Sequence, residues 1–422
     1  MKIQKSIIIQ SMINGTTRVM FWRHLIPLGL LLTLMPAPAD TTNALDGFLR
    51  DGRIHEGLAA FASPKNNSER FSLAVLQTLD GLQQFSAGLY KLGIKPDFIQ
   101  SGIPFFRVVQ PGLPQASNEI ATPEKVAELF NNFRSSLKRA NSTLTGMSDE
   151  QFKVEVNLSQ ARLDFNGDGI VSSNELLVAT LGRVLGLPSR TRTGEDLIIH
   201  FDSADAMWLK GYTHFLTGII DIILAYDWLP VWNQCAHVVF QNPDPMPPIA
   251  RFSAVSQGED FAKWADLIAA LHEMRLELRD KNGLSDARDE FRSMISCSRI
   301  CWKRVLAETD DDHKWLPSPT QTGPGGTKIT QQQIDGWMRV LDELDAILAG
   351  KKLLPHWRIK DGTGINVDRL VASPPELDLV LMIQGSAFIP YLEEGPVSDQ
   401  TTWRTLRQPF GPGFMRFAIW SQ

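Results

Sequence analysis

Residues 205–228 read DAMWLKGYTHFLTGIIDIILAYDW and form the most apolar stretch of the chain beyond its amino-terminal segment. Four ionisable side chains, Lys210, His214, Asp221 and Asp227, interrupt the apolar residues. A membrane span of this length would not carry so many polar groups. The stretch therefore predicts a central helix that is buried on most sides.

Amphipathic helices are predicted on both sides of this segment, because apolar residues recur there at three- and four-residue spacing. Several begin with a residue suited to capping, such as Thr330 with Gln333 three residues later. The predicted helices cover residues 66–93, 122–137, 261–278, 285–306 and 330–350. Their number predicts a mainly α fold, a large irregular multi-helix domain with few short strands.

The chain is expected to divide into consecutive regions. Residues 40–241 form an amino-terminal helical region, and residues 258–422 form a carboxy-terminal helical region that packs on the first as one body. Residues 242–257 connect them, since four prolines between Asn242 and Pro248 cannot continue a helix. Residues 310–328, which begin with three aspartates and continue with prolines and glycines, are expected to form an exposed loop.

A twelve-residue segment within the first region, residues 164–175, has the sequence DFNGDGIVSSNE. Oxygen-bearing side chains alternate along it, and Gly169 at its sixth position permits a sharp turn. Such a loop can wrap around a hard cation that takes six to eight oxygen ligands, as Ca²⁺ does. The expected ligands are Asp164, Asn166, Asp168, the backbone carbonyl of Ile170, Ser172 and Glu175.

This segment resembles the EF-hand calcium-binding loop at each diagnostic position, and the resemblance covers about five percent of the chain. In that family the apolar residue at position eight, here Val171, packs beneath the loop and pairs with a partner loop. No second loop with acidic ligands at the right offsets occurs in the sequence. The remainder of the chain resembles exported bacterial proteins of unknown function.

The flanks of the loop also depart from the family. Residues 152–159 alternate apolar and polar side chains, which predicts a strand or extended segment where the family has its entering helix. Residues 176–184 have the pattern of an exiting helix that Gly186 and Pro188 end. A calcium sensor opens by changing the angle between two helices. The sequence therefore predicts a calcium ion that acts as a static structural clip.

Residues 1–39 combine four basic residues and no acid with an apolar run from Leu25 to Met35 and a small-residue site at Ala37–Ala39. This pattern is typical of a secretory signal peptide. The run is too short to span a bilayer, so no stable span is expected after cleavage, although a membrane anchor is the alternative interpretation. The expected location is periplasmic or extracellular.

Charge and cysteine content exclude further classes of protein. Removal of residues 1–39 leaves 38 basic and 47 acidic residues, a net charge of −9, and no basic stripe, so nucleic acid is not an expected partner. Only Cys235, Cys297 and Cys301 occur, too few for a disulfide scaffold. Buried thiols, a disulfide that includes Cys235, and a zinc site with His237 are the alternatives.

The expected function is that of an exported calcium-binding helical protein whose activity and whose partner, a protein or an extracellular ligand, are not specified. The alternative is a metal-dependent hydrolase with a site near His200 and His214. His200 and Asp202 stand at alternate positions before the central helix, and His214 and Asp221 share one face of it. A histidine hydrogen-bonded to a carboxylate within the fold explains the same pattern without catalysis.

Overall fold

A computed structural model describes residues 44–95, 108–110, 112–115, 118–148, 150–185, 197–252 and 260–422 of the 422-residue chain. The fold is mainly helical, and its short strands pair in two-stranded sheets, so the predicted fold class is confirmed. The proposed signal segment lies outside the described residues. Among the helices of the described residues, none is long and apolar enough to cross a membrane.

The first half of the chain supplies most of the long helices. Its elements are α1 (Ala44–Arg50), α2 (Ile54–Ala60), α3 (Asn67–Lys91), α5 (Pro123–Thr145), β1 (Val154–Asn157), α6 (Leu177–Leu185), β2 (Ile198–Phe201), α7 (Ser203–Leu224), α8 (Leu229–Val239) and η4 (Pro248–Arg251). β1 pairs with β2 in antiparallel register, with Glu155 opposite His200.

The second half contributes two long helices and many short elements. They are α9 (Asp260–His272), β3 (Arg275–Leu276), α10 (Gly283–Val305), η5 (Pro324–Gly326), α11 (Gln331–Leu348), β4 (Thr363–Ile365), α12 (Val367–Ala372), β5 (Leu377–Asp378), α13 (Leu379–Gln384), η6 (Ser386–Tyr391), β6 (Leu392–Glu394), α14 (Gln400–Arg407), η7 (Gln408–Gly413) and α15 (Phe414–Ser421). β3 pairs with β5, and β4 pairs with β6.

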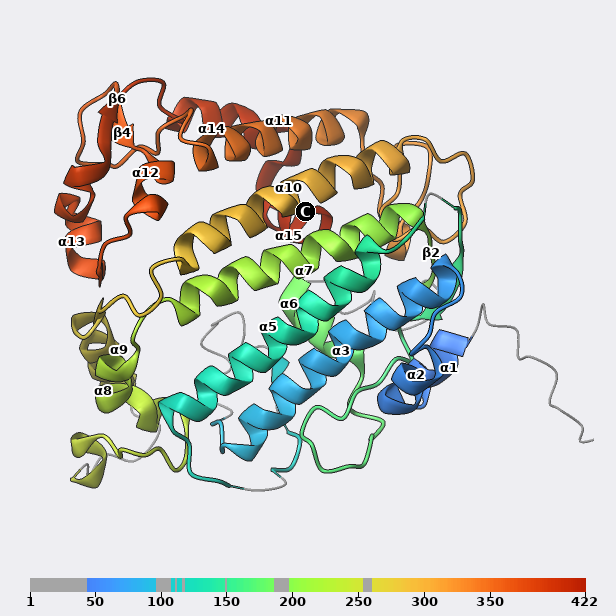
Figure 1. The fold of residues 1–422 in the computed structure, drawn as a ribbon, viewed down its shortest axis with the longest axis horizontal. Coiled ribbons are helices and arrows are strands. Elements are labelled where there is room, and N and C mark those ends of the chain that lie inside the picture. The colour runs from blue at the N-terminus through green and yellow to red at the C-terminus, as the bar shows by residue number, and fades with distance from the viewer. Residues whose placement is uncertain are drawn as a thin grey trace, which may run out of the picture. The chain divides into compact units, whose positions relative to one another are not determined.

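Four long helices, α3, α5, α7 and α10, lie side by side and form the central layer (Figure 1). α7 contacts both α5 and α10, as expected for a central helix. α10 follows the Pro-rich connection in sequence, yet it makes the most extensive helix contact of the fold with α7, which precedes that connection. Residues 40–422 accordingly form one compact unit.

Side-chain caps fix where several helices begin. Asn66 accepts the backbone N–H of Glu69 at the start of α3, and Thr122 precedes Pro123 at the start of α5. A capping box of Asp202 and Asp205 begins α7, and the predicted box of Thr330 and Gln333 begins α11. Each cap satisfies backbone donors that have no partner within the helix, so local sequence sets these starts.

Aromatic rings from distant segments fill the core beside α10. Trp302 is buried, and its ring stacks on Phe417 of α15 with centroids 6.1 Å apart. Trp337 of α11 meets the same ring at 5.8 Å. Trp302 also donates its indole N–H to the carbonyl of Ser421. The last residues of the chain therefore wrap onto the helical body.

Two local predictions were wrong. The helix expected over residues 261–278 ends at His272, because Arg275 and Leu276 pair with β5 instead. The loop of residues 310–328 is not uniformly exposed, since Lys314, Trp315 and Leu316 are buried. Both errors arise from long-range packing, which local periodicity does not report.

Candidate functional site

The loop of residues 164–175 is closed at its base by backbone hydrogen bonds. Leu163 donates its N–H to the carbonyl of Glu175, and Leu177 donates to the carbonyl of Ala161. The chain reaches the loop from β1 through a turn, without a preceding helix, and leaves it directly into α6. The predicted extended segment and exiting helix are thus confirmed. The two ends of the loop are held together as in a ring.

Asp164 determines the curvature of the first half of the loop. Its Oδ1 accepts the backbone N–H of Gly167 at 2.8 Å and of Asp168 at 3.2 Å, while its Oδ2 accepts that of Gly169 at 2.9 Å. Gly167 and Gly169 adopt φ values of +72° and +80°. Other residues rarely adopt this conformation, so both glycines are needed for the turn.

The other polar side chains of this half are also paired locally. Asn166 is buried and donates its amide to the carbonyl of Pro114 and to Oδ2 of Asp168. Asp168 accepts the N–H of Ile170 through its other oxygen, at 2.8 Å. Ile170 itself is 70 % exposed, so its side chain adds nothing to the packing beneath the loop.

Glu175 is the most enclosed carboxylate of the loop, with only 1 % of its surface exposed. Its Oε1 accepts the N–H of Phe165 at 2.8 Å, and its Oε2 accepts the N–H of Ser172 at 2.7 Å. The carboxylate therefore bridges the start and the end of the loop.

The three loop carboxylates share one electrostatic property. No Lys, Arg or His side chain within the described ranges pairs with Asp164, Asp168 or Glu175, whose hydrogen-bond partners are loop backbone N–H groups and the amide of Asn166. A buried charge in a folded protein is normally paired or coordinates a metal. The loop thus concentrates negative charge without supplying a counter-charge.

Neighbouring elements hold the loop in place. Gln83 of α3 accepts the N–H of Asp164, and Leu49 of α1 accepts the N–H of Arg162. A Cβ on Gly52, in the turn between α1 and α2, would lie 2.6 Å from Cγ1 of Val171. Val171 therefore packs against that turn, where the family resemblance implies a partner loop.

The residues expected to bind calcium are thus gathered in one loop. Among the described residues, no group of three or more His, Cys, Asp and Glu side chains is arranged to hold a metal ion. Asp168 accepts the N–H of Ile170, and Glu175 accepts those of Phe165 and Ser172. Calcium ligation by this loop stays a prediction.

A second polar site lies at the amino-terminal end of α7, beside a hollow of about 490 Å³. His200, on β2, places Nε2 2.9 Å from Oε2 of Glu155 and Nδ1 2.9 Å from Oδ1 of Asp312. Lys153 also pairs with Asp312. These contacts join the β1–β2 pair to the segment that follows α10.

Lys314 occupies the centre of this second site and is 5 % exposed. Its Nζ lies 2.9 Å from Asp202, 3.0 Å from Glu308 and 3.1 Å from Asp310. Burial opposes the charge on this amine, but the carboxylates of Asp202 and Glu308 outweigh that effect and raise the pKa of Lys314. Lys314 was not among the site residues predicted from the sequence. Its position four residues after Asp310 was the signal that could have indicated an ion pair.

Two further acids of this site are perturbed by their surroundings. Burial, and then the charge of Asp202, raise the pKa of Asp205. The same two causes, in the same order, raise the pKa of Glu308. We use the name lysine cluster for Asp202, Asp205, Glu308, Asp310 and Lys314.

The two histidines of the hydrolase alternative do not share a site. His214 places Nδ1 2.5 Å from Oε2 of Glu290 on α10, whereas His200 contacts Glu155 and Asp312. Asp221, expected on the same face as His214, pairs instead with Arg134 of α5 at 2.7 Å. Each histidine therefore has its own carboxylate partner within the fold.

The cysteines are buried free thiols in this structure. Burial raises the pKa of Cys235 and of Cys297 to about 11. Cys235 donates its thiol to the carbonyl of Asp266, and His237 lies 3.6 Å from the carboxylate of the same residue. Neither a disulfide with Cys235 nor a zinc-binding group is formed among the described residues.

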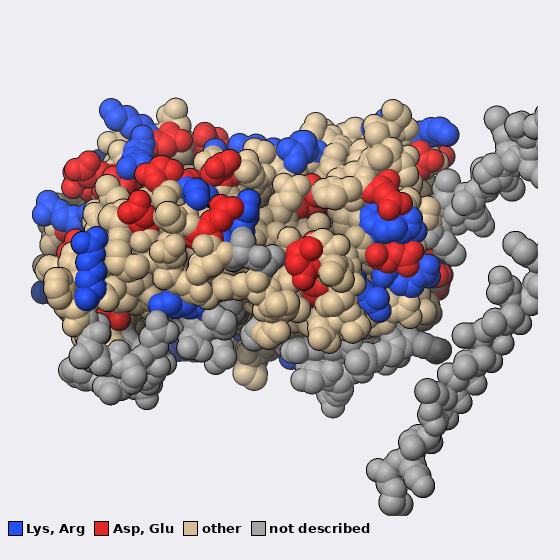
Figure 2. Space-filling view, turned by 90° about the horizontal axis from the view of Figure 1, so that it is seen from below, with Lys and Arg blue, Asp and Glu red and all other residues tan. Residues whose placement is uncertain are grey.

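The charged surface contrasts with these concentrated sites. Figure 2 shows a face on which acidic and basic side chains are interspersed. Such mixing keeps the surface potential of this face low.

No family model, curated protein or solved structure matches this chain.

Proposed function

We propose that this protein binds one calcium ion through the loop of residues 164–175 and that the ion stabilises the fold. The supporting observation is the carboxylate of Glu175, which is buried and has no cationic partner among the described residues. With Asp164 and Asp168 it brings three negative charges into one closed loop. A bound cation would balance these charges.

The donor set favours calcium over zinc and copper. The expected ligands, Asp164, Asn166, Asp168, the Ile170 carbonyl, Ser172 and Glu175, offer only oxygen atoms. Zinc and copper sites in proteins use nitrogen and sulfur ligands, whereas calcium takes carboxylate and carbonyl oxygens in flexible geometry. Binding would exchange part of the backbone N–H contacts of the carboxylates for the ion.

The position of the loop favours a structural role. Phe165, next to the first expected ligand, is fully buried in the main core, and Leu163 is too. Gln83 of α3 accepts the loop N–H of Asp164, and Leu49 of α1 accepts the N–H of Arg162, two residues before the loop. Because the entering segment is a strand and the loop is fixed to α1 and α3, an opening motion between two helices has no counterpart here. The ion would hold these elements together.

The proposed export of the chain would expose the loop to the calcium concentrations found outside the cytoplasm. Extracellular calcium modules function with dissociation constants of about 10⁻⁴ to 10⁻³ M, because their surroundings keep them loaded. An ion present at a hundred times its dissociation constant stabilises the folded state by about 2.7 kcal/mol. That is a large share of the 5–15 kcal/mol typical of a folded domain.

Thermal unfolding with calcium and with chelator tests the proposal. We expect calcium to raise the melting temperature by several degrees and Glu175→Gln to abolish the rise, because an amide supplies one oxygen and no charge. Glu128→Gln, at an exposed position of α5, is the matched control and should keep the full rise.

Calorimetric titration with calcium separates the two parts of the proposal. Binding without a change in melting temperature would overturn the structural role alone. Absence of binding up to about 10 mM calcium, ten times the largest dissociation constant expected above, would overturn calcium binding itself.

A further inference from the structure

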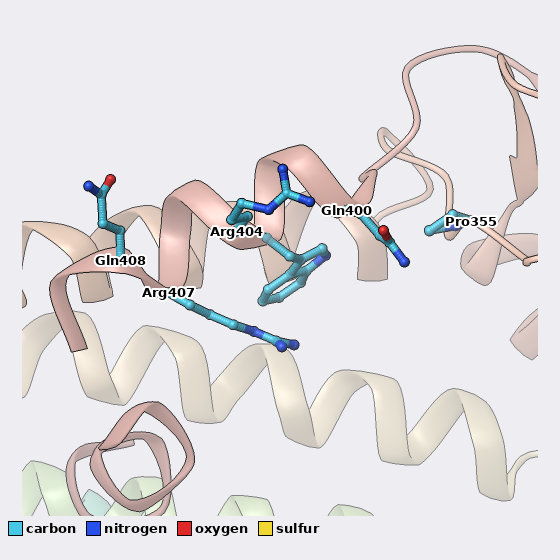
Figure 3. A pocket seen from close by; sticks show the side chains of 6 residues that line it. Pro355, Gln400, Arg404, Arg407 and Gln408 are labelled. Carbon is cyan, nitrogen blue, oxygen red and sulfur yellow. The ribbon is translucent and has the colours of Figure 1, made fainter. Parts of the chain in front are cut away.

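A hollow of about 590 Å³ lies along α14, and none of its lining residues belongs to the loop of residues 164–175 or to the lysine cluster. Its lining residues are Pro355, Gln400, Trp403, Arg404, Arg407 and Gln408. Figure 3 shows Arg404 and Arg407 one turn apart on the helix, with both side chains extending toward its Gln400 end. The volume of the hollow falls within the 300–1,000 Å³ that is usual for small-molecule sites.

Arg407 is held in a defined position by two aromatic rings. Its guanidinium carbon lies 5.6 Å from the centroid of the Trp403 ring and 5.3 Å from that of Phe414. Such contacts occupy the flat faces of a guanidinium and leave the N–H groups at its edge available. The side chain is therefore preorganised to donate hydrogen bonds.

Neither arginine of the hollow has an acidic partner within the described part of the chain. The arginines of α10 differ, since Arg288, Arg292 and Arg299 each pair with an aspartate of a neighbouring element. No acidic residue of the described ranges lines the hollow. In a chain with a formal net charge of −5, two cationic groups without acids form a local positive site.

We propose that this hollow binds a small organic anion in which a carboxylate or phosphate group adjoins a flat apolar part. The planar fork of arginine matches both anionic groups through paired N–H donors. The ring of Trp403 and the side chain of Pro355 offer apolar surface to the rest of the ligand, and the amides of Gln400 and Gln408 can bind its polar substituents.

Carboxylate and phosphate ligands share this chemistry, so benzoate and phenyl phosphate are the two probes, with benzyl alcohol as the uncharged comparator. The readout is the indole N–H resonance of Trp403, assigned by its loss in Trp403→Phe. We expect both anions to shift this resonance in a saturable way and benzyl alcohol to leave it unchanged. The anion that binds at least tenfold more tightly identifies the preferred group.

Variants separate an anion site from a merely structural arginine pair. The double change Arg404→Gln and Arg407→Gln should weaken binding at least tenfold. Arg404→Gln alone should weaken it in the same direction, and it does not disturb the ring contacts of Arg407. Arg53→Gln is the control, because Arg53 also lies over a ring, that of Phe48, but pairs with Asp51 and Glu56.

The proposal is overturned if neither anion shifts the Trp403 resonance at 20 mM, or if Arg404→Gln binds both probes as tightly as the unmodified protein. Equal binding of benzyl alcohol and the anions would also overturn it, since the arginines would then contribute nothing. Binding that weakens as sodium chloride is raised, and that Arg53→Gln retains, supports it.

Discussion

The loop of residues 164–175 and the lysine cluster both bring several carboxylates together, but they differ in how the negative charge is balanced. In the lysine cluster, Lys314 lies within about 3 Å of Asp202, Glu308 and Asp310. In the loop, the carboxylates of Asp164 and Glu175 contact only backbone N–H groups among the described residues. The lysine cluster contains a cationic side chain, whereas the loop carboxylates pair with none among the described residues.

The difference shows why acid content alone does not identify a metal site. A group of carboxylates that surrounds a lysine ammonium has its charge balanced without a metal ion. The ammonium would repel a divalent cation at that position. An acidic loop without such a partner gains stability when a cation binds. The comparison predicts that calcium stabilises the loop but not the lysine cluster, and that loss of the basic residue destabilises only the lysine cluster.

Replacement of Lys314 should have the largest effect. Lys314→Met leaves several carboxylates together without their cation, and removal of one partner from a buried ion pair typically costs about 3–5 kcal/mol. Chemical unfolding at pH 7 measures the loss, which should shrink at lower pH, where Asp205 and Glu308, whose pKa values are raised, are protonated first. Lys360→Met is the control, since Lys360 and Glu394 form an exposed pair worth at most about 1 kcal/mol.

Removal of calcium should produce the next largest effect. Chelation should lower the free energy of unfolding by about 2.7 kcal/mol when the ion was present at a hundred times its dissociation constant. Lys314→Met should keep this calcium-dependent difference, whereas Glu175→Gln should lose it. A calcium effect that disappears in Lys314→Met would show that the two sites are not independent.

In the turn of the loop, an added side chain should cost more stability at a glycine that contacts α3 than at one that does not. A Cβ on Gly167 would lie 2.8 Å from Cβ of Ala87, in addition to the strain of its positive φ, so Gly167→Ala should cost about 2 kcal/mol. Gly169 has the same strain and no such neighbour, so Gly169→Ala should cost about 1 kcal/mol. Equal losses measured by thermal unfolding would argue against a rigid contact between loop and helix.

Asp205 should give the smallest effect, and it depends on pH. Because its pKa is raised in the folded state, the stability contributed by its protonated form is present below its ordinary pKa near 3.8 and is lost as pH rises through the raised pKa. Asn mimics the protonated acid and keeps an acceptor for the N–H of Asp202. Asp205→Asn should therefore stabilise the protein by about 1 kcal/mol at pH 7 and leave it unchanged at pH 3. A gain of equal size at both pH values would contradict the sign of this shift.

Local sequence predicted much of the helical framework for a clear physical reason. The start of α3 at Asn66 and that of α11 at Thr330 depend on hydrogen bonds within four residues. The same holds for the turn of the loop of residues 164–175, where Asp164 accepts N–H groups a few residues further along the chain. Such features need no information from distant residues.

Other features depend on residues far apart in sequence and were not predictable. The end of α9 at His272 depends on the pairing of β3 with β5, about 100 residues later. From the sequence, Lys314 is expected in an exposed acidic loop, whereas in the fold it pairs with Asp202. The hollow on α14 likewise needs Pro355 from outside the helix.

The sequence by itself determined the mainly α fold, the helix starts and the composition of the oxygen-rich loop, because each depends on periodicity or on contacts within a few residues. Only the tertiary structure decided which carboxylates have a cation. Charge balance depends on distances of about 3 Å between residues that can be more than 100 positions apart, as for Lys314 and Asp202. That balance sets the lysine cluster apart from the loop proposed to bind calcium.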